Sequence, residues 1–333
     1  MKEALYYKQL NEGLVQCQLC PHFCTIFPGE RGKCGVRENK SGKLFSLVYN
    51  RLAAKGIDPI EKKPFFHFHP GEPAFSIATA GCNFFCQFCQ NCGLSQETKP
   101  DRPIFGEIVS PEHVIQLAKE SNCRIISYTY AEPTIAFEYY LEIMELAKKE
   151  GMLNTFVTNG FINPEPLKQL APLMDAANID LKGFSEDFYE KVVGGRLKPV
   201  LDSIRLYKKL GIWVELTTLI VPGENDSIDE LKKLSKFIAD LDKDTPWHIT
   251  RFYPMFKMSH LPPTPVETLQ KAALLGKETG LRYVYTGNVQ GGQEDTICPK
   301  CGAVAIKRNG FLIRSQLENG KCKSCGTTIP GVF

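Results

Sequence analysis

The sequence predicts an α/β fold whose parallel strands form a barrel, complete or partial, with the working residues at one face. Between about residues 67 and 290, short β-branched or aromatic segments alternate with helical segments, which is typical of repeated strand–helix units. Several helical segments end on glycine, a common helix stop. Polar residues gather where the expected strands end, which is where barrels carry their functional side chains.

Six apolar segments predict buried strands, and a seventh predicts an edge strand. In chain order they are AFSIATA (74–80), RIISYTY (124–130), NTFVTNG (154–160), AANIDLKG (176–183), WVELTTLIV (213–221), WHITRFYP (247–254) and the edge segment RYVYTGN (282–288). The helical segments between them are SPEHVIQLAKES (110–121), AFEYYLEIMELAKKEG (136–151), PEPLKQLAPLMD (164–175), VLDSIRLYKKLG (200–211), SIDELKKLSKFIADL (227–241) and PVETLQKAALLGKETG (265–280). The polar residues in or just after the strands are Cys82, Glu132, Asn159, Asp180, Lys182 and Thr217.

The composition sets broad limits on the class of protein. With 333 residues and 43% hydrophobic content, the chain can bury a large core. The net charge is +3 and the basic residues are spread along the chain, which favours an ordinary surface over a nucleic-acid-binding one. The N-terminal MKEALYYKQL lacks the apolar stretch of a secretion signal, and no run approaches the ~18 apolar residues of a membrane span. A cytoplasmic location is the default expectation.

Thirteen cysteines are many for a chain without a secretion signal, and their odd number argues against a disulfide framework. Twelve of them fall into three tight groups, which in a reducing compartment usually bind metal. Only Cys123 is expected to be a plain buried thiol. We therefore predict an N-terminal cysteine-rich metal-binding segment (1–66), a barrel (67–290) and a C-terminal metal-binding segment (291–333).

The central group follows the first predicted strand. Cys82, Cys86 and Cys89 form a C-x3-C-x2-C pattern in AGCNFFCQFCQNCGLS. Three thiolates on one short loop can ligate three irons of a [4Fe–4S] cluster and leave the fourth iron open, as a reactive centre requires. A zinc knuckle would more naturally take four ligands, usually as two C-x2-C pairs.

Several motifs give this sequence a family resemblance. GCNFFCQFCQN after the first strand resembles the radical S-adenosylmethionine (radical SAM) superfamily. The motifs CQLCPHFC, DPIEKKPFFHF, YTYAEPT, VTNGF, IDLKGF, LIVPGEND, ITRFYPMFKM and YVYTGNV are similar to those of its glycyl-radical-enzyme activase branch. Together with the flanking cysteine groups, they most resemble the radical SAM enzyme of the AmmeMemoRadiSam system. The resemblance covers nearly the whole chain.

The resemblance implies a partial (β/α)6 TIM-like barrel in which Cys82, Cys86 and Cys89 ligate the cluster. S-adenosylmethionine would chelate the open iron, and reduction would cleave it to methionine and a 5′-deoxyadenosyl radical that abstracts hydrogen from a substrate. In the activase branch that substrate is a glycine of a partner protein. A flavodoxin- or ferredoxin-like electron donor is implied as well, and the cofactor carries the chemistry.

The resemblance also implies residues that contact S-adenosylmethionine. Phe88 would lie near the adenine. Glu132, in YAEPT, would accept from the methionyl ammonium, or would cap a helix before Pro133. Thr158 and Asn159 would contact the ribose and carboxylate, although Asn-Gly is also a strong turn dipeptide.

The IDLKG motif resembles the Asp-Leu-Lys of the family. Strand alternation places Asp180 and Lys182 on one side and Leu181 on the other, so that both polar groups point into the barrel. They would bind a ligand or form a salt bridge with each other. Val157 departs from the activase pattern, in which an acidic residue precedes Thr-Asn-Gly, and this argues against the monovalent-cation site of that branch.

Three further residues have candidate roles. His248 and His260 are candidates for substrate contacts, but a lone histidine on a barrel strand is more often a satisfied core residue. Cys92 stands where relatives usually carry tryptophan. As a fourth ligand it would close the open iron, so we expect a free or substrate-adjacent thiol.

The C-terminal group consists of CPKCG and CKSCG, with twenty residues, Gly302 to Lys321, between the inner cysteines, a strong zinc-ribbon pattern. Cys298, Cys301, Cys322 and Cys325 are expected to bind one zinc ion and to fold a tail that is too short to hold a core alone. Iron in a rubredoxin-like site is the alternative.

The N-terminal group, CQLCPHFC…GKC, has the spacing C-x2-C-x3-C-x9-C. Cys17, Cys20, Cys24 and Cys34 are expected to bind zinc, with an auxiliary iron–sulfur cluster as the alternative, and His22 could replace one thiol.

The alternative hypothesis is a non-catalytic metal- or nucleic-acid-binding protein with zinc at all three cysteine groups. Basic and aromatic residues are not clustered together in the sequence as a nucleic-acid-binding surface would need. The sequence therefore favours the enzyme hypothesis over this one.

Overall fold

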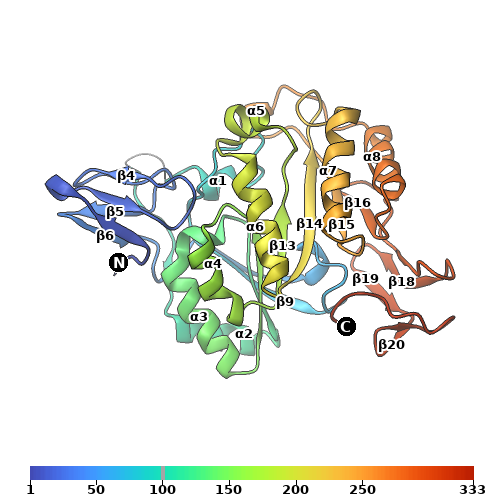
Figure 1. Ribbon diagram of the computed structural model, residues 1–333. Coiled ribbons are helices and arrows are strands. Elements are labelled where there is room, and N and C mark those ends of the chain that lie inside the picture. Colours follow the sequence, from blue (N-terminus) through green and yellow to red (C-terminus); the bar gives the residue numbers. More distant parts are fainter. Residues whose placement is uncertain (99–101) are drawn as a thin grey trace.

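The computed structural model describes residues 1–98 and 102–333. Its centre is an eight-stranded sheet in the order β16-β15-β14-β13-β12-β11-β9-β8 (Figure 1). The strands are β8 (Ala54–Pro59), β9 (Pro73–Ala78), β11 (Ile125–Tyr128), β12 (Leu153–Thr158), β13 (Ala176–Asp180), β14 (Trp213–Ile220), β15 (Trp247–Arg251) and β16 (Val284–Gly287). All neighbours pair in parallel except β8 and β9, which are antiparallel. Within the described ranges β16 pairs only with β15, so the predicted barrel is partial.

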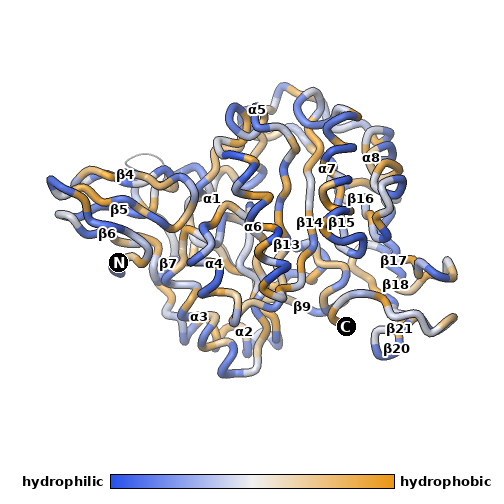
Figure 2. The backbone as a smooth tube through the Cα atoms, in the orientation of Figure 1, coloured by the Kyte–Doolittle hydropathy of each residue, from blue (hydrophilic) through white to orange (hydrophobic). Residues whose placement is uncertain are grey.

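Helical crossovers join the seven parallel strands, as the sequence predicts. The helices are α1 (Cys92–Ser95), α2 (Pro111–Glu120), α3 (Phe137–Lys149), α4 (Pro164–Leu170), α5 (Glu186–Phe188), α6 (Leu197–Lys209), α7 (Ile228–Leu241) and α8 (Val266–Glu278). The hydroxyls of Ser110 and Ser227 cap α2 and α7 by accepting from backbone N–H groups three residues on. Figure 2 shows apolar and polar positions alternating along α6 and α7, which present one apolar face to the sheet.

Most element boundaries agree with the sequence prediction, and the differences have local causes. The segment predicted at 176–183 ends as a strand at Asp180, because the chain then turns into the loop that carries Lys182. The helix predicted at 164–175 ends at Leu170, and a 3-10 turn (Ala171–Leu173) containing Pro172 follows.

The N-terminal segment forms small sheets beside the barrel. Its strands are β1 (Lys2–Glu3), β2 (Tyr7–Gln9), β3 (Val15–Cys17), β4 (Thr25–Ile26), β5 (Arg37–Lys40), β6 (Lys43–Ser46) and β7 (Arg51–Leu52), with β10 (Glu107–Ile108) paired to β7. Strand β8 was not predicted, yet it extends the main sheet by pairing with β9 from Ala54↔Ala78 to Pro59↔Pro73. The division of the chain at residue 66 stays a prediction.

The C-terminal segment lies against the barrel. Its strands are β17 (Thr296–Ile297), β18 (Val304–Asn309), β19 (Leu312–Ser315), β20 (Leu317–Glu318) and β21 (Lys321–Cys322). Val332 forms a parallel bridge with Phe68, and the Arg308 guanidinium donates to the Phe66 carbonyl at 2.6 Å. Phe66 also packs in one cluster with Tyr283, Tyr285 and the tail. The tail is therefore joined to the barrel by a backbone bridge, a side-chain hydrogen bond and apolar contacts.

A buried ion pair fixes the N-terminal segment to α3. Glu138 accepts from Arg37 at 2.8 and 3.1 Å, and both side chains are 2% exposed. We expect Glu138→Ala to lower the free energy of unfolding by about 3–5 kcal/mol, because Arg37 would stay buried without its partner. Chemical denaturation would measure the loss. Glu142→Ala is the control, because Glu142, one turn along α3, pairs with Lys2 at the surface and should contribute about 1 kcal/mol or less. Equal losses in the two variants would contradict the prediction.

Candidate active site

One cavity of about 800 Å³ contains the predicted site residues. It lies within the partial barrel and reaches the loops after the parallel strands, and its size is that of a cofactor or small-ligand site. All nine residues predicted to hold the cluster or S-adenosylmethionine line it: Cys82, Cys86, Phe88, Cys89, Glu132, Thr158, Asn159, Asp180 and Lys182. Val157, Thr217 and His248 line it as well, so the strands bring together residues that are far apart in the sequence.

The loop that carries the central cysteines is held by backbone hydrogen bonds. Phe85 N donates to Val193 O at 2.8 Å, and Gln87 N donates to Val192 O at 3.0 Å. Two glycines follow these valines. A Cβ atom at Gly195 would collide with the Phe84 ring, so the loop approaches this backbone too closely for a side chain. This contact was not predicted, although the Gly-Gly pair in VVGGR indicates a close approach of the backbone.

The three cysteines of the motif face the cavity, whereas Cys92, at the start of α1, is not among the described residues that line it. The Cys82 Sγ accepts from Phe84 N at 3.3 Å and from Asn159 Nδ2 at 3.8 Å. Cys89 Sγ lies 3.1 Å from Ser95 Oγ. These donors suit thiolates, because hydrogen bonds to sulfur stabilise cluster ligands.

The cysteines fit a [4Fe–4S] cluster better than a single ion. A zinc–sulfur bond of 2.3 Å in a tetrahedron separates ligand sulfurs by ~3.8 Å, whereas a [4Fe–4S] cluster separates them by roughly 6 Å. Cys82, Cys86 and Cys89 are not among the described groups whose ligand atoms all lie within 4.8 Å of one another. Burial raises the pKa of Cys86 to about 12, which Lys182 partly opposes.

Glu132 joins the ends of two neighbouring strands. Its carboxylate accepts from Thr158 Oγ1 at 2.7 Å, Asn159 N at 2.8 Å and Thr134 N at 3.0 Å. Burial raises its pKa, although these hydrogen bonds oppose the shift. The bond to Thr134 caps the 3-10 helix Pro133–Ala136, as the alternative interpretation of Glu132 expected. Asn159 continues the network, since its Nδ2 donates to Asn83 Oδ1 at 2.7 Å beside Cys82.

Asp180 and Lys182 point into the same cavity and form an ion pair at 2.9 Å, while Leu181 is fully buried on the other side. Burial lowers the pKa of Lys182, but Asp180 and then Cys86 outweigh it, so the net pKa is raised and the ammonium is retained. The ammonium lies 5.9 Å from the Phe88 ring centre, and Phe88 stacks on Phe188 with an interplanar angle of 5°. A fixed cation therefore stands beside the cysteine loop.

The two candidate histidines differ in position. His248 is buried and its Nε2 lies 2.7 Å from Glu215 Oε2, so it is a satisfied core residue that also lines the cavity. His260 is exposed and is not among the described residues that line the cavity. Glu215 also accepts from the backbone N–H groups of Phe66 and His67, so this buried carboxylate joins three segments of the chain.

His67 makes the attachment of the tail sensitive to pH. Its Nδ1 lies 2.6 Å from Pro330 O, which can only accept, so Nδ1 donates and Nε2 accepts from the Tyr285 hydroxyl at 2.6 Å. Burial lowers the pKa of His67 to about 4, below the value near 6.5 of an unfolded chain. Between pH 4 and 6.5 this histidine binds a proton in the unfolded state but not in the folded state. Its contribution to the free energy of unfolding is therefore fully present above pH 6.5 and is lost as the pH falls toward 4.

We therefore expect wild-type protein to lose about 1 kcal/mol more stability than His67→Gln when the pH falls from 7.5 to 5.5. Thermal or denaturant unfolding at the two pH values would measure this difference. His260→Gln, which changes an exposed histidine, should behave as wild type. An identical pH dependence in wild type and His67→Gln would disprove the assignment.

A group around Lys63 lines the same cavity and was missed as a site. The buried Lys63 ammonium pairs with Asp58 at 2.5 Å, and the Tyr130 hydroxyl donates to the same carboxylate. Burial lowers the pKa of Lys63 to about 8, although Asp58 opposes the shift. Tyr130 has a positive φ of 63°, which directs it out of the strand. The motif DPIEKKPFFHF contained the signal, but nothing in its spacing predicts contact with Tyr130.

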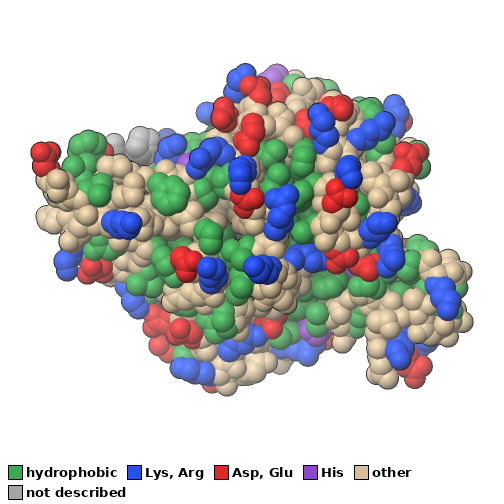
Figure 3. All heavy atoms as spheres, viewed as in Figure 1, with side chains coloured by type: hydrophobic (Ala, Val, Ile, Leu, Met, Phe, Trp, Pro, Cys, Tyr) green, Lys and Arg blue, Asp and Glu red, His purple; other side chains and the backbone are tan. Residues whose placement is uncertain are grey.

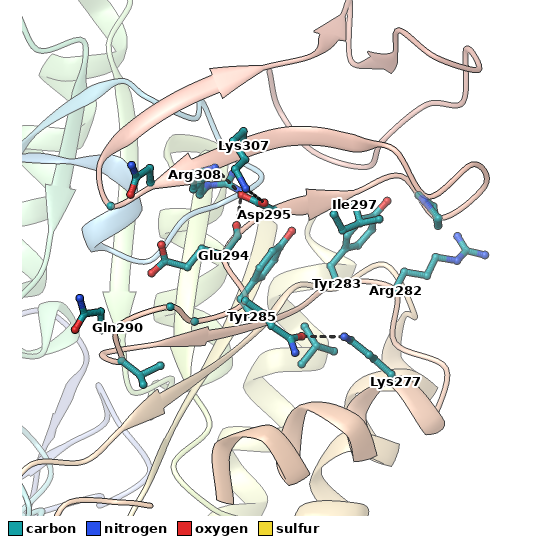
Figure 4. A pocket seen from close by; sticks show the side chains of 18 residues that line it. Lys277, Arg282, Tyr283, Tyr285, Gln290, Glu294, Asp295, Ile297, Lys307 and Arg308 are labelled. Carbon is teal, nitrogen blue, oxygen red and sulfur yellow. Dashed lines mark hydrogen bonds and ion pairs between the residues drawn. The ribbon is translucent and has the colours of Figure 1, made fainter. Parts of the chain in front are cut away.

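A second cavity of about 910 Å³ separates β16 and α8 from the tail. Figure 4 shows Tyr283 beside Ile297, and Asp295 next to Lys307 and Arg308 on the strand opposite. Tyr285, Val289, Glu294 and Gly310 line both cavities, so the tail forms part of the wall of the site. On the face shown in Figure 3, basic and acidic side chains are interspersed, without a basic stripe.

The C-terminal cysteines form a compact metal-ligand group. Cys298 Sγ lies 3.6 Å from Cys325 Sγ, Cys301 Sγ lies 3.8 Å from Cys322 Sγ, and all four sulfurs lie within 4.8 Å of one another. This quartet could hold a metal ion. Cys123 is buried, as expected. None of the described helices is long and apolar enough to cross a membrane.

Comparisons with known proteins agree with the geometry of the site. The radical SAM superfamily model matches residues 76–238. Over 334 residues the chain is 47% identical to an uncharacterized protein of Methanocaldococcus jannaschii, with 99% of both chains covered. A second protein of that organism, named as a candidate glycyl-radical enzyme activating enzyme, is 29% identical over 53% of this chain and 66% of its own length.

Solved structures share the fold. A radical SAM methyltransferase from Sphaerobacter thermophilus superposes with a TM-score of 0.53 over 67% of this chain and 68% of that one, at 15% identity. From the family match and the cysteine loop at the mouth of a partial barrel, we conclude that this chain belongs to the radical SAM superfamily.

Proposed function

We propose that this protein is a radical SAM enzyme of the activase-like type, which abstracts a hydrogen atom from a glycine of a partner protein. The observation that carries the proposal is the convergence of three cysteines, without Cys92, and six predicted contact residues on one cavity. When bound, the reduced cluster supplies the electron that splits S-adenosylmethionine into methionine and a 5′-deoxyadenosyl radical. The name of the activating-enzyme relative supports the choice of a glycine substrate.

The chain's own residues bind and orient the cofactors. Cys82, Cys86 and Cys89 hold the cluster, and their loop is fixed by Val192 and Val193. The Asp180–Lys182 pair and Phe88 form the wall nearest the cysteines, where a cation and an aromatic ring suit a carboxylate and an adenine.

Glu132, Thr158 and Asn159 act as one hydrogen-bonded unit at the strand ends. Because Glu132 already accepts three hydrogen bonds, it orients Thr158 and Asn159 toward the ribose and carboxylate, and it has lone-pair capacity left for the methionyl ammonium. Zinc is proposed for the C-terminal quartet, and a flavodoxin- or ferredoxin-like protein is proposed as the electron donor.

The primary experiment is to measure 5′-deoxyadenosine after anaerobic reconstitution and reduction. We expect product from S-adenosylmethionine in protein that contains iron and sulfide. Protein that contains zinc alone, with no labile sulfide, would instead support a non-catalytic zinc protein.

The substrate class is tested separately with the proteins of cells grown on glycine deuterated at the α-carbon. Deuterium in 5′-deoxyadenosine would support abstraction from a glycine. Product that forms without deuterium, and only when a small-molecule fraction is added, would contradict the activase-like assignment.

A further inference from the structure

The N-terminal cysteines converge on a second enclosed site. The β3–β4 hairpin bonds Cys17 N to Cys24 O at 2.9 Å, and the chain returns with Cys34 before β5. Cys17, Cys20, Cys24 and Cys34 line one small, largely apolar cavity.

The sulfurs of this quartet are less closely grouped than those of the C-terminal quartet. The C-terminal quartet has the compact geometry of a zinc tetrahedron, with sulfur pairs at 3.6 and 3.8 Å. The N-terminal quartet, although it lines one cavity, is not among the described groups whose ligand atoms lie within 4.8 Å of one another. In this respect it resembles the central group. Thiolates on a [4Fe–4S] cluster stand farther apart than those on one zinc ion, because iron and sulfide lie between them.

A buried hydrogen-bond donor without a partner also favours a [4Fe–4S] cluster over a zinc ion at this site. Arg37 lines the cavity and is 1% exposed, and its two terminal nitrogens bond Glu138 and Leu5 O. Its Nε has no hydrogen-bond partner among the described residues. A cluster offers sulfide acceptors besides its four thiolates, so it could satisfy this donor.

The cavity of the N-terminal cysteines adjoins the loop that carries Cys82. His22 Nε2 lies 2.7 Å from the carbonyl oxygen of Asn83, the residue after Cys82. Asn83 also lines the small cavity. On the other side, a Cβ atom at Gly81 would lie 2.7 Å from Val36 Cγ1 and 3.0 Å from Cys34 O. One residue on either side of Cys82 therefore contacts the N-terminal site.

We propose that Cys17, Cys20, Cys24 and Cys34 bind a second [4Fe–4S] cluster, which serves as a one-electron carrier beside the Cys82 loop. Four thiolates close its coordination, which suits electron transfer rather than substrate binding. It takes one electron from a low-potential donor of the flavodoxin or ferredoxin class and passes that electron to the primary site. No bond is made or broken at the second site. The assignment of the metal does not depend on the substrate proposed above.

The test is the metal content of anaerobically reconstituted full-length protein. We expect wild type to contain about eight irons, about eight sulfides and about one zinc per chain. The triple variant Cys82→Ala, Cys86→Ala, Cys89→Ala should retain about four irons in the N-terminal cluster. Cys20→Ser with Cys24→Ser should lose about four irons but keep the electron paramagnetic resonance signal of the primary cluster and its change on adding S-adenosylmethionine.

The matched control is Cys298→Ser with Cys325→Ser, which should lose the zinc and keep all the iron. About four irons and two zincs in the wild type would overturn the proposal without any variant. A protein donor should reduce the primary cluster more slowly in the Cys20→Ser, Cys24→Ser variant than in the wild type. Dithionite should reduce it at the same rate in both. Equal rates with the protein donor would overturn the carrier role. Eight irons without 5′-deoxyadenosine would instead count against the proposed function alone.

Discussion

Replacing Cys86 by alanine is expected to abolish the primary cluster and to lower the formation of 5′-deoxyadenosine by more than about 100-fold, since changes in the outer shell of a metal site alone cost 10- to 100-fold. Cys86 is the most buried thiol of the motif, and its side chain faces the cavity next to Lys182. Without it, two thiolates remain on the loop, too few to hold three irons. Iron and sulfide analysis and the product assay would both report the loss.

Cys92→Ala is the matched control for this experiment. It removes a thiol from the same stretch, but one that does not belong to the described lining of the cavity. We expect this variant to keep its iron and its activity. Loss of the primary cluster in Cys92→Ala would show that four side chains close the cluster, and this would defeat the enzymatic interpretation.

Replacing Cys298 and Cys325 by serine is expected to unfold the C-terminal segment while the barrel stays folded. Binding of a structural zinc ion contributes about 10–16 kcal/mol in zinc-finger peptides, and the tail's short strands enclose too small a core to replace it. Hydrogen exchange should then become fast across residues 291–333 and stay slow in the central strands. Zinc analysis would measure the loss of the ion in parallel.

Ser324→Ala is the control for this variant, because Ser324 is an exposed neighbour of Cys325 and the substitution leaves both thiols in place. It should keep the zinc and the slow exchange. A tail that remains protected in the double variant without metal would contradict the prediction and would assign its stability to the contacts of Phe66 and Arg308 with the barrel.

The sequence predicted the central fold because its strands and helices have strong local patterns. The strands β9 and β11 to β16 are short runs rich in apolar and β-branched residues and are largely buried. A helix with one apolar face lies between each of these strands and the next. The same regularity located the site: in a parallel sheet the residues after each strand meet at one edge, so Cys82, Glu132, Asn159 and Lys182 had to lie near one another.

The features that the sequence did not predict depend on contacts between distant segments. Strand β8 has the sequence AKGIDP, whose glycine, lysine and proline give no strand signal, and it forms because β9 offers an unpaired edge. The Lys63–Asp58–Tyr130 group joins residues up to 72 positions apart. The carboxylate of Glu215 bonds to Phe66 and His67, which no periodicity in either segment could show.

The cysteine loop makes backbone hydrogen bonds to Val192 and Val193, within the π-helix Tyr189–Val193. We therefore expect these contacts within the polypeptide to hold the loop in place before iron binds. During biogenesis the barrel can therefore fold first, and the proteins that deliver iron and sulfide then load a loop that is already in place. Late loading also has a consequence for oxidation. Until the cluster is bound, the reduced thiols of the loop are exposed to any oxidant that enters the cavity.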